Sequence, residues 1–582
     1  MIKTLAKSIR QYKKSSIITP VFMFFEVLME VSIPFLMARL IDVGIEAGNM
    51  TEIIKLGAIL LACALLSLAS GYMAGKYAAF ASSGFASNLR FDIYENVQRF
   101  SFTNIDKFST ASLITRLTTD VTNVQNAYQM IIRLAFRAPL MLIFAFVASM
   151  MIDNQLSMIF VAFIPILAIA LYIIQSKAHP LFERVFNTYD HLNSVVGENL
   201  SGIRAVKAYN REDYENSKFK KISMSIFSDF SKAETIIAAN GPIMQFCVFG
   251  SMLLLAWFGA HAIVSSGNNE DIGLSTGELT SLIAYTMQIL MSLMMLSFVF
   301  VMIVISRASA ERITEVLREQ SDIFDGKENI TEIKNGDIEF DKVSFKYSEK
   351  ADKNVLDKID FSIKSGETVG ILGGTGSSKS SLISLIPRLY DATEGVVRVG
   401  GVDVRDYNIK ALRDAVSVVL QKNVLFSGSI KDNIRWGDEN ATDEEIERVC
   451  KLACADSFIE QFPDRYDTHI EQGGTNVSGG QKQRLCIARA LMKKPHVLIL
   501  DDSTSAVDTK TDAQIRKALK NEIPHTTKII IAQRVASVED ADKIIVLDDG
   551  HIAAMGTHDE LMKSSEIYKE VYESQNRTVE DK

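Results

Sequence analysis

The chain has 582 residues, of which 48% are apolar and 23% are charged, and its mean hydropathy is slightly positive. This length exceeds one compact core, so two or three domains are expected. A uniform soluble protein rarely combines so much apolar and charged sequence, which indicates an apolar part joined to a polar one. The formal net charge of −8 leaves no basic excess to neutralise phosphates, which argues against nucleic acid as a partner.

The cysteines form no recognisable metal or disulfide framework. Cys450 and Cys454 are four residues apart on an expected helix, a spacing that can suit a metal pair. No histidine or second cysteine pair has matching spacing, so we interpret the cysteines as buried thiols in a reducing cytosol. The full set is Cys63, Cys247, Cys450, Cys454 and Cys486.

The N-terminal segment 1–16 is basic, and it shows no cleavable signal sequence. Ile2, Leu5 and Ile9 recur in it at helical spacing. Apolar residues on one face and basic residues elsewhere predict an amphipathic helix on the inner membrane surface. The alternative is a basic start that is simply solvated.

Six apolar runs are long enough to cross a bilayer, which takes about 20 residues of helix. The connections at 43–54, at Asp153 and at 266–278 contain no lysine or arginine, whereas the alternate connections are basic. The positive-inside rule therefore places both ends of a six-span, all-α domain over 1–318 in the cytoplasm of a bacterial cell. The predicted spans are 17–42, 56–82, 132–152, 155–178, 237–264 and 279–305.

The two basic connections inside the domain, 83–131 and 179–236, have helical periodicity and few glycines or prolines. Long stretches of that kind are rarely loops, so we expect the spans to continue into the cytoplasm and return. Polar segments near their tips, around 102–110 and 210–219, are where they could contact another domain. A soluble helical bundle, the alternative, would need no charge asymmetry between alternate connections.

Two carboxylates, Glu26 and Glu30, lie one helical turn apart within the first span. A charge at mid-membrane costs about 2.5–3.5 kcal/mol on the insertion scale, so it usually faces a partner or a water-filled cavity. One interpretation is a cation-attracting wall of a substrate cavity. The other is a structural hydrogen bond to a neighbouring span, or a position near the membrane interface.

After Arg318 a polar linker over 319–334 leads into a second domain over 335–582, expected to be α/β. Within it, the apolar strand 369–372 runs into a glycine-rich turn followed by Lys379, a serine and a helix. This is the phosphate-loop arrangement, in which backbone N–H groups cradle the phosphates of ATP, the lysine reaches the terminal phosphates and the serine hydroxyl ligates Mg²⁺. The candidate residues are Gly373, Gly374, Thr375, Gly376, Ser377, Ser378, Lys379, Ser380 and Ser381, with Ser378 in the usual place of a glycine.

Two further elements accompany the phosphate loop. The apolar strand 496–500 ends in Asp501 and Asp502, a Walker-B type of element whose first aspartate holds Mg²⁺ through water. Between strand and phosphate loop lies the sequence Asn-Val-Ser-Gly-Gly-Gln-Lys-Gln-Arg over 476–484. With this segment the chain resembles the ABC transporter family, whose signature is Leu-Ser-Gly-Gly-Gln before a helix, and the resemblance covers nearly the whole chain as a half-exporter.

The resemblance implies roles for further residues. Tyr347 matches the aromatic residue that stacks on adenine, and Gln421 matches a glutamine near Mg²⁺ and the membrane domain. Asp508, at the end of Ser-Ala-Val-Asp over 505–508, matches the segment that crosses to a partner subunit. The signature residues would contact the partner's ATP, and they are Ser478, Gly479, Gly480 and Gln481.

Two departures from the family pattern concern catalysis. The hydrolysing site of the family has glutamate where this chain has Asp502, and a histidine where it has Gln533. Withdrawing the carboxylate by one methylene can cost on the order of 100-fold in rate. Glutamine can hydrogen-bond a phosphate but cannot carry the charge of an imidazole. Together the changes predict a site kept for binding ATP and Mg²⁺ more than for hydrolysis.

This pattern resembles the weaker half of heterodimeric bacterial multidrug exporters. The resemblance implies a second, non-identical half-transporter whose competent site is completed by the signature of this chain. The expected substrate is an amphiphilic drug or lipid. A nucleotide-gated channel or regulator, and a peptide exporter, are the alternatives.

Overall fold

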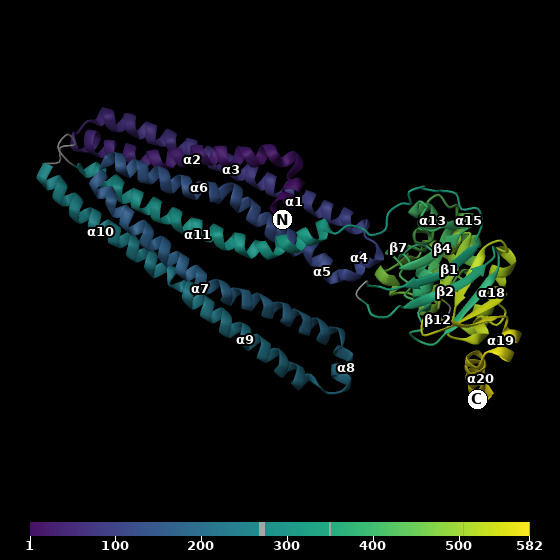
Figure 1. The fold of residues 1–582 in the computed structure, drawn as a ribbon. Helices are drawn as coiled ribbons and strands as arrows, with labels where there is room; N and C mark the ends of the chain where they lie inside the picture. The colour runs from purple at the N-terminus through teal and green to yellow at the C-terminus, as the bar shows by residue number, and fades with distance from the viewer. Residues whose placement is uncertain (267–273, 349–350, 504–505, 581–582) are drawn as a thin grey trace. The chain divides into compact units, whose positions relative to one another are not determined.

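The computed structural model describes the 582 residues except 267–273, 349–350, 504–505 and 581–582 (Figure 1). The chain divides into two compact units. The first comprises Met1–Gln98 with Ser109–Glu319, and the second comprises Arg99–Phe108 with Gln320–Lys582.

The first unit is entirely helical over the part of the chain that the structure describes, with six helices long and apolar enough to cross a membrane. All six predicted spans lie within them, which confirms the predicted fold class for this half. Its elements are α1 Ile2–Ala6, η1 Lys7–Tyr12, α2 Lys13–Arg39, η2 Leu40–Glu46, α3 Met50–Gln98, α5 Thr110–Thr115, η3 Arg116–Asp120, α6 Val121–Ile152, α7 Asn154–Ser201, α8 Ile203–Ala208, α9 Glu212–Ala238, α10 Asn240–Ser266 and α11 Thr276–Arg318.

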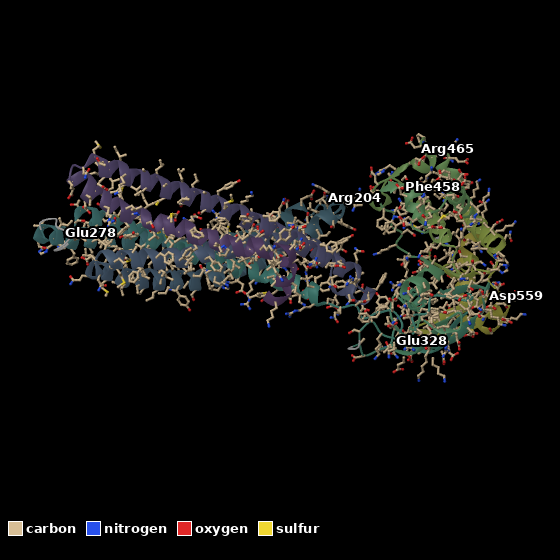
Figure 2. All side chains as sticks on the ribbon, turned by 90° about the horizontal axis from the view of Figure 1, so that it is seen from above. Arg204, Glu278, Glu328, Phe458, Arg465 and Asp559 are labelled. Atoms are coloured by element: carbon tan, nitrogen blue, oxygen red, sulfur yellow. The ribbon has the colours of Figure 1, made fainter. Side chains whose placement is uncertain are left out.

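The long helices continue well beyond the apolar runs, as their periodicity predicts: α3 has 49 residues and α7 has 48. Figure 1 shows α7 and α9 side by side, joined at their shared end by α8. The chain turns at the tip of this hairpin where Gly202 ends α7 and Asn210 has a positive φ of 49°, so the polar segment around 210–219 begins at the tip. Arg204 lies at this end of the first unit and Glu278 at the opposite end, as Figure 2 shows.

The N-terminal segment does not form the predicted continuous amphipathic helix. It is broken at Arg10, whose φ of 41° and ψ of −118° are incompatible with a helix. The break lets two polar side chains reach α3, where Ser8 donates a hydrogen bond to Asp92 at 2.5 Å and Arg10 pairs with the same carboxylate. Leu5 is buried, whereas Ile2 remains 76% exposed.

The second unit is α/β and contains a six-stranded sheet of order β12-β11-β3-β10-β9-β6, in which only β12 is antiparallel to its neighbour. A four-stranded antiparallel sheet has the order β2-β1-β4-β5. The strands are β1 Ile338–Phe345, β2 Leu356–Ile363, β3 Thr368–Gly373, β4 Glu394–Val399, β5 Val402–Asp403, β6 Val416–Val419, β7 Gly428–Ser429, β8 His469–Ile470, β9 Val497–Asp501, β10 Thr527–Ile531, β11 Lys543–Asp548 and β12 His551–Gly556.

Helices cover both faces of the six-stranded sheet. The central strands are largely apolar, as expected for parallel strands buried on both sides. Successive residues of β9 enter different core clusters, Leu498 and Leu500 one and Val497 and Ile499 the other. The helices are α4 Phe102–Lys107, α12 Lys379–Leu385, α13 Ile409–Ala415, α14 Ile430–Arg435, α15 Asp443–Leu452, α16 Asp456–Ile459, η4 Arg465–Asp467, η5 Gln472–Gly474, α17 Gly479–Met492, α18 Thr509–Glu522, η6 Val535–Ser537, α19 His558–Ser564 and α20 Glu566–Glu580.

One short helix of the second unit comes from far earlier in the chain. In α4, Ser101 caps the helix reciprocally with Asn104. The Phe102 ring lies 5.9 Å from the Tyr390 ring, and the Tyr390 hydroxyl donates a hydrogen bond to Asp106 at 2.7 Å. Burial and this bond both raise the pKa of Tyr390. The segment around 102–110, singled out as polar by the sequence, thus packs within the α/β unit.

Candidate nucleotide site

The parallel order of the sheet gathers the predicted site at one edge. Strands β3, β10 and β9 are neighbours, so their carboxyl ends lie side by side. The phosphate loop follows β3, Asp501 and Asp502 end β9, and Gln533 follows β10. Crevices at the carboxyl ends of parallel strands are where α/β proteins bind ligands.

The phosphate loop has the expected shape, including at its unusual serine. Gly376 has a φ of +86°, and a side chain there would meet only open space. Ser378 has a φ of 70° and a ψ of 22°, the left-handed conformation that favours glycine. Gly374 and Thr375 are exposed in the same loop. The backbone therefore follows the path for which the motif uses glycine, at a steric cost to Ser378.

Lys379 begins α12 with its ammonium turned onto the loop. It donates to the carbonyl oxygens of Gly373 at 2.9 Å and Gly374 at 2.7 Å, and to the Ser377 hydroxyl at 3.1 Å. Burial lowers the pKa of Lys379, and the nearby Asp501 and Asp502 oppose that shift. An incoming phosphate would give this ammonium a charged partner in place of neutral carbonyls.

Two of the three candidate magnesium ligands, Ser380 and Asp501, are in contact, whereas the third, Gln421, contacts Asp502. The Ser380 hydroxyl donates to Asp501 Oδ2 at 2.9 Å. Asp501 is only 5% exposed, and burial is the main cause that raises its pKa, with Asp502 adding to the effect. A hydroxyl and a buried carboxylate are oxygen donors of the kind that Mg²⁺ takes together with phosphates, so these residues fit the ion.

Asp502 is held by two amides. Gln533 Nε2 lies 3.1 Å and Gln421 Nε2 lies 3.5 Å from the same oxygen, Asp502 Oδ2. Asp502 also has a left-handed φ of 48°. The three residues assigned to catalysis are therefore brought together.

Tyr347 lies where an adenine could stack. Its hydroxyl is 2.8 Å from the Ser381 hydroxyl of α12, so the ring stands over the helix that follows the phosphate loop. The ring makes edge contacts with Phe345 and Tyr390 and stays 48% exposed.

The signature segment forms a separate structure. Ser478 caps α17, accepting from the N–H of Gln481 at 3.3 Å, while the Ser478 N–H donates to Gln481 Oε1 at 2.8 Å. A Cβ added to Gly480 would lie 2.8 Å from the Ala506 carbonyl oxygen, so this glycine permits close approach of the 506–508 segment. Within the part of the chain that the structure describes, no hydrogen bond joins Ser478 to the phosphate loop.

Asp508 has a local role in the structure. It caps α18 by accepting from the Thr511 N–H at 2.9 Å, and hydrogen bonding to the side chain and then to the backbone of Thr511 lowers the pKa of Asp508. A further contact was not singled out from the sequence: the Ala506 N–H donates to Gln483 at 3.1 Å, tying this segment to α17. The first residue of the predicted segment, Ser505, lies outside the described residues.

Both halves of the chain match known families. Residues 16–293 match the model of the ABC transporter transmembrane region, and residues 356–505 match that of the ABC transporter. The uncharacterised ABC transporter ATP-binding protein YfiB of Bacillus subtilis is 37% identical over 567 residues, with 97% of each chain covered. The chain belongs to the ABC transporter family.

Other relatives extend this comparison. The uncharacterised ABC transporter ATP-binding protein Rv1273c of Mycobacterium tuberculosis is 33% identical over 581 residues, covering 99% of the transporter chain and 98% of the relative. A solved structure of a bacterial Atm1-family ABC exporter with ATP bound has a TM-score of 0.82 at 22% identity. It covers 97% of the transporter chain and 98% of its own, so the two share a fold along their whole length.

Within the membrane unit of the transporter, Glu26 and Glu30 share one arginine. Arg137 of α6 lies 3.1 Å from Glu26 Oε1 and 2.8 Å from both carboxylate oxygens of Glu30. This contact supports the structural interpretation of the two glutamates, an ion pair between spans, over an open cation-attracting wall. The predicted third span contains Arg137, and an arginine in an apolar run was the signal that could have found the partner.

The ion pair belongs to a larger polar cluster. Gln288 of α11 donates to the Glu30 carbonyl oxygen at 3.2 Å, and a Cβ on Gly71 of α3 would lie 3.1 Å from the Glu26 carboxyl carbon. Glu26 Oε2, Gln288 Oε1 and Arg133 Nε are buried without a hydrogen-bond partner. Side chains from α2, α6 and α11 thus meet beside the glycine of α3, with Glu26 buried and Arg137 and Glu30 partly exposed.

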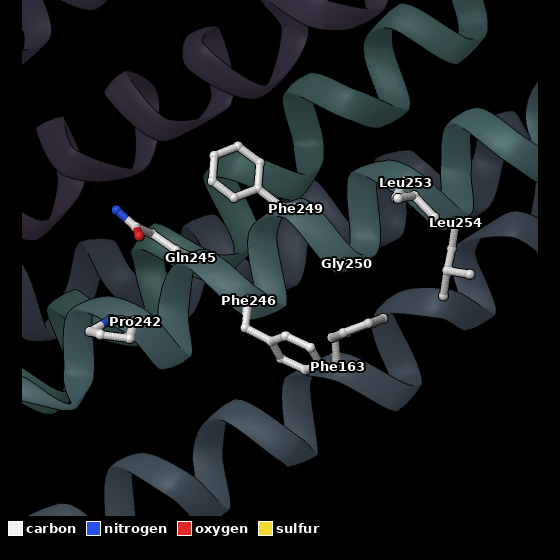
Figure 3. Close-up of a pocket in the computed structure, with 8 residues that line it drawn as sticks. All are labelled: Phe163, Pro242, Gln245, Phe246, Phe249, Gly250, Leu253 and Leu254. Carbon is white, nitrogen blue, oxygen red and sulfur yellow. The ribbon is translucent and has the colours of Figure 1, made fainter.

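A groove of about 540 Å³ lies between α7 and α10 in the membrane unit (Figure 3). Phe246 of α10 points toward Phe163 of α7, and Gly250 allows that approach because its Cβ would lie 3.1 Å from the Phe163 ring. Gln245 is the one lining residue with a polar side chain. The groove therefore suits hydrocarbon and offers no charge to a ligand.

Proposed function

We propose that the chain is one subunit of an ATP-driven exporter of amphiphilic compounds, and that its own nucleotide site serves binding more than hydrolysis. Its signature would complete the catalytic site of a second, non-identical subunit. ATP and Mg²⁺ are the proposed cofactors, and the N-terminus and the ATP-binding domain are proposed to lie in the cytoplasm.

The observation that carries this proposal is the pair of amide donors on Asp502. A general base must accept a proton from water, and here the Gln533 amide donates to the carboxylate at 3.1 Å while Gln421 lies at 3.5 Å. The shorter aspartate also withdraws the carboxylate from the place of a glutamate. Neither amide can exchange a proton near neutral pH, whereas an imidazole can.

The first experiment repairs this site. We expect Asp502→Glu with Gln533→His to raise the turnover of this site by roughly an order of magnitude or more, if chemistry limits it. The measurement is the ATPase activity of the complex with its partner. The catalytic glutamate of the partner is replaced, so that the measured hydrolysis comes from the site of this chain. Asp559→Glu with Gln514→His makes the same replacements at exposed positions of α19 and α18 and serves as control.

The partner itself is tested by purification. The chain alone should bind ATP but turn it over slowly, and the co-purified complex should be active. Equal turnover by a homodimer and by the complex would contradict a binding-only site. An active membrane complex that moves no amphiphile, and instead passes ions when ATP binds, would favour a nucleotide-gated channel.

The trans role of the signature can be separated from its role as a helix cap. We expect Ser478→Ala to remove activity of the complex while ATP binding at the phosphate loop of this chain persists, because the hydroxyl would donate to the partner's ATP. Ser429→Ala is the matched control, since Ser429 forms the same reciprocal cap on α14 with Asp432. Comparable losses in both variants would show that only the cap is important.

A further inference from the structure

Away from the nucleotide site, the ATP-binding unit contains a cavity of about 370 Å³. It lies between α18, the start of β3, β10 and the turn through η6. Its volume falls in the range of small-molecule sites, roughly 300–1,000 Å³. Its lining is mixed, with apolar side chains such as Leu519 and Ile530 beside four cationic ones.

The most unusual residue of this cavity is Lys528. It lies on β10, is 3% exposed, and lines the cavity. Its ammonium forms no hydrogen bond or ion pair with the described residues. Burial lowers the pKa of Lys528, nearby Lys520 lowers it further, and Asp542 acts in the opposite direction. The side chain is almost entirely buried while its ammonium borders the cavity, so an anion that enters the cavity would give this charge a partner.

The neighbouring charges point the same way. Arg516, Lys517, Lys520 and Lys528 line the cavity against a single lining carboxylate, Asp540. The guanidinium of Arg516 has two long contacts, 3.4 Å to Asp512 and 3.5 Å to Asp540, and its Nε has no hydrogen-bond partner. This excess of cations stands out in a chain whose net charge is −8.

We propose that this cavity binds a small organic phosphate. The phosphate would sit between the ammonium groups of Lys520 and Lys528, and its organic part would lie against Leu519 and Ile530. A phosphate monoester carries up to two negative charges and several acceptor oxygens, which matches converging donors on a helix and a strand. A monocarboxylate would leave part of this charge unpaired.

The place of the cavity connects it to the nucleotide site. Helix α18 starts after Asp508, and η6 starts two residues after Gln533. A ligand held between α18 and β10 would therefore restrain both segments at once. We expect binding to change the ATP turnover of the assembled transporter even though the ligand does not touch ATP.

The test uses pyridoxal 5′-phosphate on the intact complex. Its aldehyde condenses with an unprotonated lysine amine and releases water, and borohydride then reduces the imine to a stable adduct that peptide mass spectrometry assigns to one lysine. Pyridoxal lacks the phosphate and closes to an internal hemiacetal that slows its reaction with every lysine. Because phosphate guides the probe, the ratio of the rates with the two aldehydes should be on the order of 10-fold larger at Lys528 than at the exposed Lys510. Millimolar inorganic phosphate should protect Lys528.

Matched variants on one helix decide whether the cavity is a site. Lys520→Gln should slow labelling of Lys528 by about fivefold, because it removes one of the two charges that hold the phosphate. Lys510→Gln removes a charge from the exposed first turn of α18, outside the cavity, and should change nothing. Absence of labelling at Lys528, an equal ratio of the two rates at Lys528 and Lys510, or equal effects of the two variants would overturn the proposal. Labelling of Lys379 is read separately, so failure here leaves the proposed ATP site untouched.

Discussion

A pair of neighbouring carboxylates in the membrane unit and another in the ATP-binding unit of the transporter differ in their surroundings. In the membrane unit, Glu26 and Glu30 both contact the guanidinium of Arg137. In the ATP-binding unit, Asp501 accepts from the Ser380 hydroxyl, and the ammonium of Lys379 bonds carbonyl oxygens of the loop. The first pair has its counter-ion within the protein, whereas among the described residues Asp501 receives its side-chain hydrogen bond from the neutral hydroxyl of Ser380.

This difference shows what each pair is prepared for. A buried charge without compensation is expensive, so a structural pair carries its counter-ion in the fold. Asp501, by contrast, forms no ion pair among the described residues, so a cation bound with ATP at the proposed site would relieve a shortage of positive charge. The raised pKa of Asp501 agrees with this, because burial disfavours its charged form and no nearby cation compensates fully.

The largest expected effect comes from removing the internal counter-ion of the membrane pair. Arg137→Met should destabilise the membrane unit by about 3–5 kcal/mol, because it removes the counter-ion of the buried Glu26 and of the partly exposed Glu30. The measurement is thermal unfolding of the purified complex in detergent, followed by the fraction that remains monodisperse.

Two further variants make this result specific. Adding Glu26→Gln and Glu30→Gln to Arg137→Met should restore most of the lost stability, because no charge then remains unpaired. Arg307→Met removes an exposed arginine that pairs with Glu311 on α11, a contact worth about 0–1 kcal/mol. Unchanged stability in Arg137→Met would mean that water, and not arginine, compensates the two glutamates.

The second prediction concerns the carboxylate of Asp501, the candidate ligand of Mg²⁺. Asp501→Asn should weaken the stabilisation of the chain by Mg-ATP on the order of 100-fold in ligand concentration, as losses of single electrostatic groups do at such sites. The same change should stabilise the nucleotide-free chain, because it removes a buried charge that only the ligand compensates. Thermal shifts measured with and without Mg-ATP report both effects. A nucleotide-free variant that melts lower would show that Asp501 is already compensated.

The predicted fold needed little beyond local pattern. Apolar runs and the charges between them gave six spans, and the phosphate loop with its downstream aspartates gave the α/β unit. The side chains brought together around Asp502 could also be anticipated, because β3, β9 and β10 belong to a parallel sheet whose carboxyl ends converge. A resemblance to a family supplied Gln421 and Tyr347, which no local pattern would single out.

What sequence could not supply were contacts between distant elements. The pairing of Arg137 with two glutamates depends on how α2 packs on α6, and no spacing along the chain encodes that. The break at Arg10 depends on Asp92, 82 residues away. The same holds for the basic cavity, because Lys520 and Lys528 face one space only once α18 covers β10.

A third prediction concerns how the stability of the nucleotide-free chain depends on pH through Asp501. The folded pKa of Asp501 is raised, so its contribution to stability is complete below the ordinary value of about 4 and is lost as the pH rises through the folded value. The nucleotide-free chain should therefore lose this contribution on going from about pH 4 upward. Asp501→Asn should remove that part of the slope in the melting temperature. A slope identical in both proteins would assign it to other groups.

The smallest effect concerns strain in the phosphate loop. Ser378→Gly should stabilise the ATP-binding unit by about 1 kcal/mol, because glycine adopts the left-handed φ of 70° without a Cβ clash. Ser384→Gly places the same substitution inside α12, where it should destabilise by about 0.5–1 kcal/mol. Thermal melting compares the two variants directly, and the same sign for both would contradict strain at Ser378.

The early helix α4 also sets an order of events during synthesis. Asp106 and the tyrosine that bonds it are 284 residues apart. At about 5–20 residues per second, a ribosome reaches Tyr390 roughly 15–60 seconds after it has made Asp106. During that interval α4 has been synthesised, but the residues on which it packs have not. The second unit therefore cannot be completed before the six spans have been made. A nascent chain halted before the second unit would therefore present Phe102 and its neighbours to chaperones, and release of these factors would report that the unit has closed.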